Sequence, residues 1–249
     1  METNYGNYLP KKLMDISFGV CVFFLLMQYA NEFSLKSNVI RIITVVLFTI
    51  SMIFTIYLHL VNNKFRHDKG RLLKKLHKTM IKTLNFSGKG KALDVGCKRG
   101  ELTIALAKNY KHAEITGLEH DTKIDCDINA KVEKVKKRTN FVEGNVGALG
   151  FKDQTFEAVT SCLAFSRAKV YDKGVQEALR VLKKNGTFCF VDDFDNPKHY
   201  NIQALIQSLK DAGYKQVLYR DHLENEPYVS KMVKVPGIYK NIGMLYGRK

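Results

Sequence analysis

Residues 94–100 read Asp-Val-Gly-Cys-Lys-Arg-Gly and combine an acid with two glycines in a short turn. An apolar strand over 91–95 precedes this turn, and a helix is expected to begin directly after Gly100, over 101–107. Such a turn needs glycine where φ must be positive or where a ligand lies against the backbone. The helix that follows presents free N–H groups and the positive end of its dipole. This strand-turn-helix predicts a site for a nucleotide-like ligand.

Other polar side chains stand where predicted strands end. Glu119, Asn145, Ser161 and Asp192 follow or end the strands expected over 114–118, 140–143, 156–161 and 186–192. In a doubly wound sheet, ligands bind beyond the carboxyl ends of the strands. We expect Glu119 to hold a ribose, because a carboxylate accepts hydrogen bonds from both hydroxyls. Asp94 can orient an ammonium group or bond loop amides, and the Asn145 amide can meet an adenine edge.

The glycines exclude a dinucleotide site. A G-x-G-x-x-G fingerprint that starts at Gly96 would need glycine where Lys98 and Glu101 stand. The acids Asp94 and Glu119 also suit a ligand with a positive end better than a pyrophosphate. S-adenosylmethionine (SAM) has that character.

The elements around this turn predict one α/β domain. From residue 85 onward, strand-like and helix-like segments alternate over about 160 residues, the size of a single domain. Helices are expected over 123–138, 174–183 and 202–212, and two last strands over 215–220 and 242–248. The pattern indicates a doubly wound sheet.

Four segments in order resemble class I SAM-dependent methyltransferases, particularly the small-molecule, quinone and lipid branch. They are 93–100, which is similar to the first family motif, 117–119 with the ribose acid, 144–159 and 177–186. The resemblance covers the chain from about residue 72 to its end. It implies a seven-stranded Rossmann-like methyltransferase sheet with SAM as the cofactor, in a domain that we assign to residues 91–249.

The resemblance also implies roles for individual residues. Asp94, Gly96 and Gly100 would surround the methionine part of SAM, Glu119 would hold the ribose, His120 would lie near the adenine, Asn145 and Val146 would complete the adenine pocket, and Ser161 belongs to the same cofactor-binding set. The chain departs from the family at three places. Lys98 replaces the second motif glycine, Arg99 follows it, and Asn145 stands where the family usually has an acid.

The sequence assigns neither a catalytic base nor a metal. His199, Tyr200, His222, Glu226 and Tyr228 stand near the expected pocket mouth, but each also fits an ordinary surface loop. The five cysteines are isolated and include no C-x-x-C pair, which indicates reduced cytosolic thiols and no metal site.

The first third of the chain predicts a membrane anchor over 1–62. Residues 42–58 carry no charge, and with 59–61 they give a helix about 30 Å long, enough to cross the hydrocarbon core. The run over 16–30 is shorter and lacks a small-x-small cleavage pattern, so a retained anchor is favoured over a signal peptide. We therefore expect one or two transmembrane helices, at about 13–30 and 39–61. A buried hairpin in a soluble protein is disfavoured because the second run is apolar on all faces.

Residues 63–90 predict a basic amphipathic helix or linker. Between 64 and 82, eight cations stand against the single acid Asp68, a difference of +7; they are Lys64, Arg66, Lys69, Arg71, Lys74, Lys75, Lys78 and Lys82. The segment either binds anionic head groups or is a solvated face of the helix before the sheet. The positive-inside rule places both termini and the methyltransferase domain in the cytosol.

The leading hypothesis is a membrane-anchored SAM-dependent methyltransferase that acts at the cytosolic face on a lipid, isoprenoid or other membrane-associated small molecule. One alternative is a catalytically silent methyltransferase-like interaction module, which Lys98 favours. Another is a tethered protein or RNA methyltransferase. The formal charge of +16 alone does not indicate nucleic acid, because the densest basic block follows a membrane span and no zinc-finger or RNA-binding signature appears.

Overall fold

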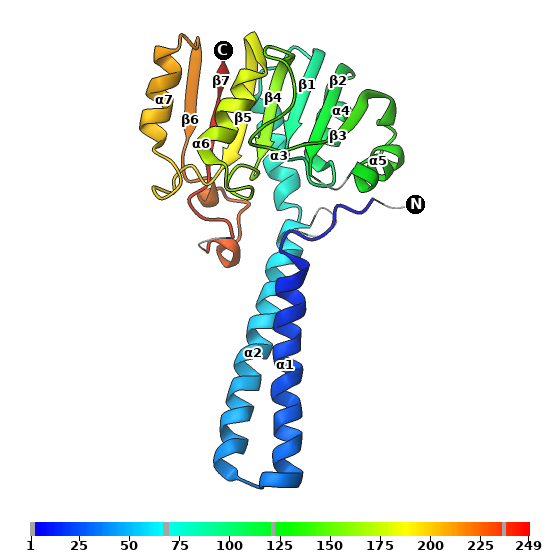
Figure 1. Cartoon of the computed structure of the whole chain (residues 1–249), viewed down its shortest axis with the longest axis vertical. Helices are drawn as coiled ribbons and strands as arrows, with labels where there is room; N and C mark the ends of the chain where they lie inside the picture. The colour runs from blue at the N-terminus through cyan, green and yellow to red at the C-terminus, as the bar shows by residue number, and fades with distance from the viewer. Residues whose placement is uncertain (1–2, 67–69, 121–122, 236–237) are drawn as a thin grey trace. The chain divides into compact units, whose positions relative to one another are not determined.

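The computed structural model describes residues 3–66, 70–120, 123–235 and 238–249 (Figure 1). The chain forms two compact units. One comprises residues 6–73, and the other joins residues 3–5 to 74–249. Asp68 and Lys69 of the predicted basic segment lie outside the described residues.

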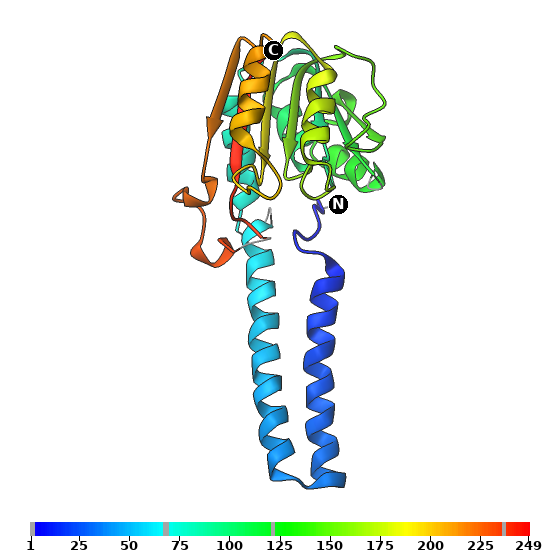
Figure 2. The ribbon, with the colours of Figure 1, turned by 60° about the vertical axis from the view of Figure 1, so that its left-hand side comes forward.

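The first unit is an antiparallel helical hairpin (Figure 2). It contains α1 (Lys11–Ala30), a π-helical turn (Asn31–Leu35) and α2 (Asn38–Phe65). Both predicted apolar helices are therefore present, and α2 continues to Phe65. Two stretches, Lys11–Ser34 and Asn38–Phe65, are long and apolar enough to cross a membrane.

Small and polar side chains lie between the two helices of the hairpin. Ser17, Cys21, Thr44 and Thr55 are buried, and the Cys21 Sγ lies 3.3 Å from the Thr55 Oγ1. Most of the large apolar side chains point outward, for example Phe18 and Ile42, which are 62% and 63% exposed. Exposed apolar surface of this extent marks contact with lipid or with another protein.

Asn62 fixes the segment that enters α1 against the end of α2. Its Oδ1 accepts hydrogen bonds from the backbone N–H groups of Tyr8 and Leu9, at 2.9 and 3.3 Å. The Tyr8 ring stacks on Phe65 with centroids 3.7 Å apart. These contacts therefore hold the segment before α1 against the last turn of α2 within this unit.

The second unit is built on a seven-stranded sheet in the order β3-β2-β1-β4-β5-β7-β6. The strands are β1 (Lys89–Val95), β2 (His112–Glu119), β3 (Thr139–Glu143), β4 (Phe156–Cys162), β5 (Leu182–Asp192), β6 (Gln216–Arg220) and β7 (Gly243–Arg248). β7 pairs antiparallel with both β5 and β6, whereas the other pairs are parallel. The predicted seven-stranded Rossmann-like fold is confirmed.

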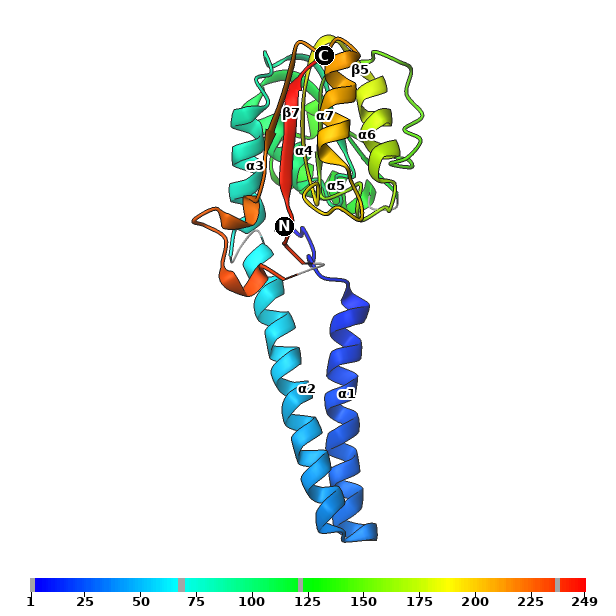
Figure 3. The same cartoon turned by 90° about the vertical axis from the view of Figure 1, so that its left-hand side faces the viewer.

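Helices cover both faces of this sheet. They are α3 (Leu72–Thr83), α4 (Glu101–Asn109), α5 (Lys123–Val132), α6 (Tyr171–Arg180) and α7 (Ile202–Asp211). Figure 3 shows α3 on one side of β7, and α6 and α7 on the other. Phe165, Phe188 and Phe190 lie in the core cluster beside the buried side chains of α6.

Two predicted helices have different bounds. The helix predicted over 123–138 ends at Val132, because Lys134 adopts a positive φ of 58° and a short 3₁₀ turn, Lys136–Arg138, follows. The helix predicted over 174–183 occupies Tyr171–Arg180 instead, because Leu182 already pairs with Phe156 in the sheet. Sheet pairing therefore overrides helical propensity at this end.

The basic segment contributes an amphipathic helix to the second unit. Leu76, Met80 and Leu84 of this segment are at most 1% exposed, so its apolar side is buried in protein and does not lie on acyl chains. The Tyr110 hydroxyl donates a hydrogen bond to the Ile81 carbonyl at 3.1 Å. The side chains of Lys74, Lys75, Lys78 and Lys82 are exposed.

Candidate functional site

The turn after β1 has the backbone conformation that its glycines predict. Gly96 has a φ of +73°, and a Cβ there would lie 2.3 Å from the Ala164 Cβ. Gly100 has a φ of +81° and precedes α4, and a Cβ there would lie 3.0 Å from the Phe141 ring. Both positions therefore require glycine. The N–H groups of Gly96 and Cys97 donate to the Leu118 carbonyl, which joins the turn to β2.

Lys98 stands at the second motif glycine and keeps a glycine-like conformation. Its φ is 51°, in the left-handed region, which costs about 1–2 kcal/mol for a residue with a side chain. The side chain is half-buried, and burial together with the neighbouring Arg167 lowers the pKa of Lys98 to about 8. Lys98 therefore preserves the shape of the turn but adds a poorly solvated amine.

Glu119 ends β2 and faces the turn. Its Oε2 accepts hydrogen bonds from the Lys98 backbone N–H at 2.8 Å and from Arg167 Nη2 at 2.7 Å. Its Oε1 accepts from the His120 backbone N–H at 3.1 Å. The same Arg167 Nη2 lies 3.2 Å from the Gly96 carbonyl. Glu119 therefore lies beside the turn and is held by Arg167, an arginine that the sequence did not single out.

Asp94 and Ser161 lie inside the sheet. Asp94 is 1% exposed, and its carboxylate accepts hydrogen bonds from the Thr103 and Thr160 hydroxyls at 2.7 and 3.4 Å. Burial raises the pKa of Asp94 to about 7, although these hydrogen bonds oppose the rise. The Ser161 hydroxyl donates to the Val95 carbonyl at 3.1 Å. The contacts of both side chains tie β1 to its neighbours.

The residues expected around an adenine follow β2 and β3. His120 and Asn145 are exposed. The Asn145 Oδ1 accepts the Gly147 N–H at 2.7 Å, so this side chain stabilises its own turn. Val146 is buried in the core cluster. Asn145 and Val146 thus form a defined turn at the carboxyl edge of the sheet.

Comparisons with known proteins agree with this geometry. Residues 93–190 match the family described as "Methyltransferase domain". The chain is 33% identical over 126 residues to a sterol 24-C-methyltransferase from Neurospora crassa, and 33% identical over 110 residues to a demethylmenaquinone methyltransferase from Staphylococcus haemolyticus. These matches cover 47% and 44% of this chain, and 33% and 46% of the relatives. The chain thus spans half or less of the curated relatives that it matches.

A solved structure shows the same fold. Geranyl diphosphate C-methyltransferase from Streptomyces coelicolor, in complex with Mg²⁺, geranyl diphosphate and S-adenosyl-L-homocysteine, superimposes with a TM-score of 0.54. The identity is 13%, and the match covers 73% of this chain and 79% of that one. This chain contains a class I methyltransferase domain.

A buried acid shapes the loop after β4 of the methyltransferase domain. Asp192 accepts hydrogen bonds from the backbone N–H groups of Phe165, Ser166 and Asp193. Burial raises the pKa of Asp192 to about 6, despite the opposing hydrogen bonds. Because this loop carries Arg167, Asp192 positions the arginine that holds Glu119.

A second titratable group lies beside the turn of the methyltransferase domain. Glu101, the first residue of α4, has its Oε1 3.8 Å from the His77 Nδ1 of α3. Burial raises the pKa of Glu101 to about 7, although Lys98 opposes the rise. A carboxylate of this kind can accept a proton near neutral pH. No local pattern in the chain signals this pair, because the two residues meet only when α3 packs near the start of α4.

The other candidate bases lie in two segments of the methyltransferase domain, the loop after β5 and the segment after β6. His199 pairs with Asp193 and stacks on Tyr171, and Glu226 pairs with Arg220. Tyr200 is buried in the core cluster, Tyr228 lies with its ring 5.8 Å from the Lys75 Nζ, and His222 lies between two carboxylates.

Proposed function

We propose that this protein is a membrane-anchored SAM-dependent methyltransferase that acts at the cytosolic face on a lipid, isoprenoid or other membrane-associated small molecule. The proposal rests on one observation above all: a methyltransferase domain that keeps Gly96, Gly100 and Glu119 shares its chain with two helices of membrane-spanning length.

The residues of the turn fit SAM. Gly96 and Gly100 give the turn the positive φ values that it needs after β1, and Glu119 presents a carboxylate at the end of β2. The Oε2 of Glu119 already accepts two hydrogen bonds, so ribose hydroxyls would replace the one from Arg167, whose side chain is 35% exposed. When bound, SAM supplies an electrophilic methyl group on a sulfonium.

The chain's own part in methyl transfer is alignment, exclusion of water and, for an acidic acceptor, removal of a proton. Glu101 lies at the start of α4, directly after the turn, and its pKa of about 7 suits it to accept a proton near neutral pH. Its neighbour His77 lies near enough to stabilise the ionised form when protonated. We propose these two residues as the acid-base pair of the site.

The activities of the relatives support the proposed class of acceptor. They include methyltransferases of a sterol and of demethylmenaquinone, which are both largely apolar small molecules. Such acceptors reside in or at a membrane, where an anchored enzyme meets them.

The topology is supported by both ends of the hairpin. Before α1, the backbone N–H of Asn4 donates to the Asn129 Oδ1 at 2.8 Å, and the Asn129 Nδ2 donates back to the Asn4 carbonyl at 3.0 Å. The chain after α2 continues into the same methyltransferase domain. Both ends of the hairpin therefore belong on one side of the membrane. The cations that follow α2 favour the cytosolic side.

The exposed lysines of α3 support anionic head groups as partners. Lys74, Lys75, Lys78 and Lys82 remain in solvent while the apolar side of the helix is buried. Each cation near an anionic leaflet contributes on the order of 1 kcal/mol. We propose that this surface contacts the membrane that holds the hairpin.

A partition experiment tests the proposed activity. Membranes from cells that make the protein are incubated with methyl-labelled SAM, and label is expected in the organic extract. Glu119→Gln should reduce the transfer about tenfold or more at limiting SAM, whereas Glu143→Gln, which changes an exposed acid at the end of β3, should leave it unchanged. Label confined to pelleted macromolecules would instead favour a tethered protein or RNA methyltransferase, and a purified protein that does not bind SAM would refute the proposal.

A silent methyltransferase-like interaction module is the second candidate. The observation that favours it is the pair of cations at the turn, Lys98 with its lowered pKa and Arg167 on Glu119. Both disfavour a positively charged ligand. Calorimetry with SAM separates the two candidates: binding by the unmodified chain supports the enzyme, and binding only by Lys98→Gly supports the silent module.

A further inference from the structure

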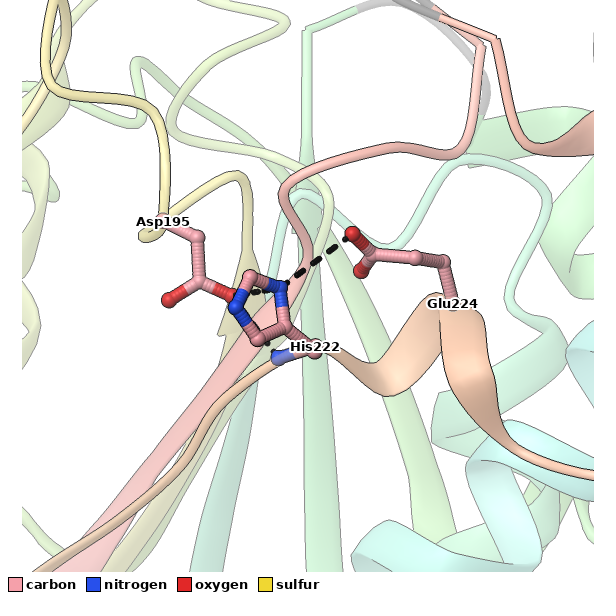
Figure 4. A group of neighbouring side chains, drawn as sticks. All are labelled: Asp195, His222 and Glu224. Atoms are coloured by element: carbon pink, nitrogen blue, oxygen red, sulfur yellow. Dashed lines mark hydrogen bonds and ion pairs between the residues drawn. The ribbon is translucent and has the colours of Figure 1, made fainter.

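Three metal-ligating side chains from two loops converge at one edge of the sheet. Asp195 follows β5, and His222 and Glu224 follow β6 (Figure 4). β5 and β6 run in the same direction, because both pair antiparallel with β7. Their carboxyl ends therefore lie at the edge where this kind of sheet binds its ligands.

The spacing of the three side chains differs from that of a hydrogen-bonded cluster. The His222 Nδ1 lies 3.6 Å from the Asp195 Oδ2 and 3.5 Å from the Glu224 Oε1. Both distances exceed the 2.7–3.2 Å of an ordinary N–H···O bond. Ligand atoms at about 2.1 Å from a tetrahedral ion are about 3.4 Å apart. The two distances from His222 therefore resemble those of a coordination sphere, and all three ligand atoms lie within 4.8 Å of one another.

Each carboxylate is oriented by its own hydrogen bonds. The Asp195 carboxylate accepts from the Tyr219 hydroxyl and from the His222 backbone N–H. The Glu224 carboxylate accepts from the backbone N–H groups of Asn241 and Ile242, at 3.0 and 3.1 Å. Outer partners of this kind preorganise metal ligands.

The histidine is also held in place, but it remains accessible. His222 adopts a left-handed φ of 48°, which directs its ring between the two acids. Its side chain is 57% exposed, whereas that of Glu224 is 8% exposed. An ion bound here would have two sheltered carboxylates on one side and solvent on the other.

We propose that Asp195, His222 and Glu224 bind one divalent first-row transition-metal ion, for which Zn²⁺ is the representative. One imidazole and two carboxylates form a donor set that such ions accept, with a further coordination position toward solvent. The ion joins the loop after β5 to the segment after β6 and so fixes the carboxyl edge of the sheet. This site uses none of the cysteines and does not depend on the proposed methyl transfer.

Zinc titration of the full-length protein tests this site. The protein is purified in detergent, treated with a chelator, dialysed and titrated with Zn²⁺ in a calorimeter. We expect one equivalent to bind, and His222→Asn to weaken that binding at least tenfold. Asparagine suits the left-handed conformation, so the variant keeps the loop. The matched control His112→Asn changes an exposed histidine at the start of β2 and should bind as the unmodified protein does.

Cobalt substitution identifies the ligands. A Co²⁺ complex of the unmodified protein should absorb weakly in the visible range without the thiolate charge-transfer band that cysteine ligands produce. Absence of saturable Zn²⁺ binding, equal binding by His222→Asn, or a thiolate band would each overturn the proposal. Equal Zn²⁺ binding by both proteins, combined with a lower melting temperature of His222→Asn, would show that the three side chains stabilise the fold as ion pairs and do not bind a metal.

Discussion

Asp94→Asn tests whether the acid of the first motif is protonated in the folded protein. Asp94 is fully buried, and its pKa of about 7 lies well above the ordinary value of 3.8. Between these two values the folded state keeps a proton that the unfolded state has released. The group therefore stabilises the fold at low pH, and that contribution is lost as the pH rises to about 7.

The magnitude follows from the pKa difference. One pKa unit corresponds to about 1.4 kcal/mol, so raising the pH from 5 to 8 costs the native protein about 2.5 kcal/mol through Asp94 alone. Asparagine cannot ionise, so position 94 of Asp94→Asn contributes no change in the free energy of unfolding over this pH range. For a chain of this size 1 kcal/mol corresponds to about 2–4 °C. Between pH 5 and pH 8, the melting temperature of the unmodified protein should therefore fall by about 5–10 °C more than that of Asp94→Asn.

Scanning calorimetry of both full-length proteins in detergent, at pH 5 and pH 8, measures this difference. The other buried acids, Glu101 and Asp192, are present in both proteins, so their contributions largely cancel. Asp211→Asn, at the exposed end of α7, serves as the control and should show the same pH dependence as the unmodified protein. A melting-temperature difference that stays constant within about 1 °C between the two pH values would refute a raised pKa for Asp94.

Three further substitutions probe the turn and its acid. Gly96→Ala should lower the free energy of unfolding by about 2 kcal/mol or more, because its Cβ would lie 2.3 Å from the Ala164 Cβ. Gly213 also has a positive φ but has open space around it, so Gly213→Ala should lower the free energy of unfolding by less in the same calorimetric scan. Lys98→Gly should raise the melting temperature, since relief of the left-handed strain, about 1–2 kcal/mol, exceeds the entropic cost of glycine, about 0.5–1 kcal/mol. Glu119→Gln should weaken SAM binding about tenfold or more in titration calorimetry, because hydrogen bonds to a charged group contribute about 1.5–3 kcal/mol.

Local signals predicted the parts of the site that lie at the ends of single strands, namely the turn after β1 and the last residue of β2. The glycines of 96 and 100 and the acid at 119 follow from the need for positive φ and from the end of a strand, and the structure has all three in place. The environment of Asp94 was less predictable. A strand-end acid can face a ligand or the neighbouring strands, and only the positions of Thr103 and Thr160 show which bonds it makes.

The sequence by itself determined the order of strands and helices, the glycine turn and the two apolar helices, because each depends on periodicity or conformational preference within a few residues. Only the tertiary structure decided which distant side chains meet. β1 lies between β2 and β4, so the loop after β4 reaches the turn after β1 and brings Arg167 to Glu119. In the same way, the antiparallel β7 between β5 and β6 brings Asp195 near His222. Sheet order sets these contacts, and no local pattern in the chain encodes them.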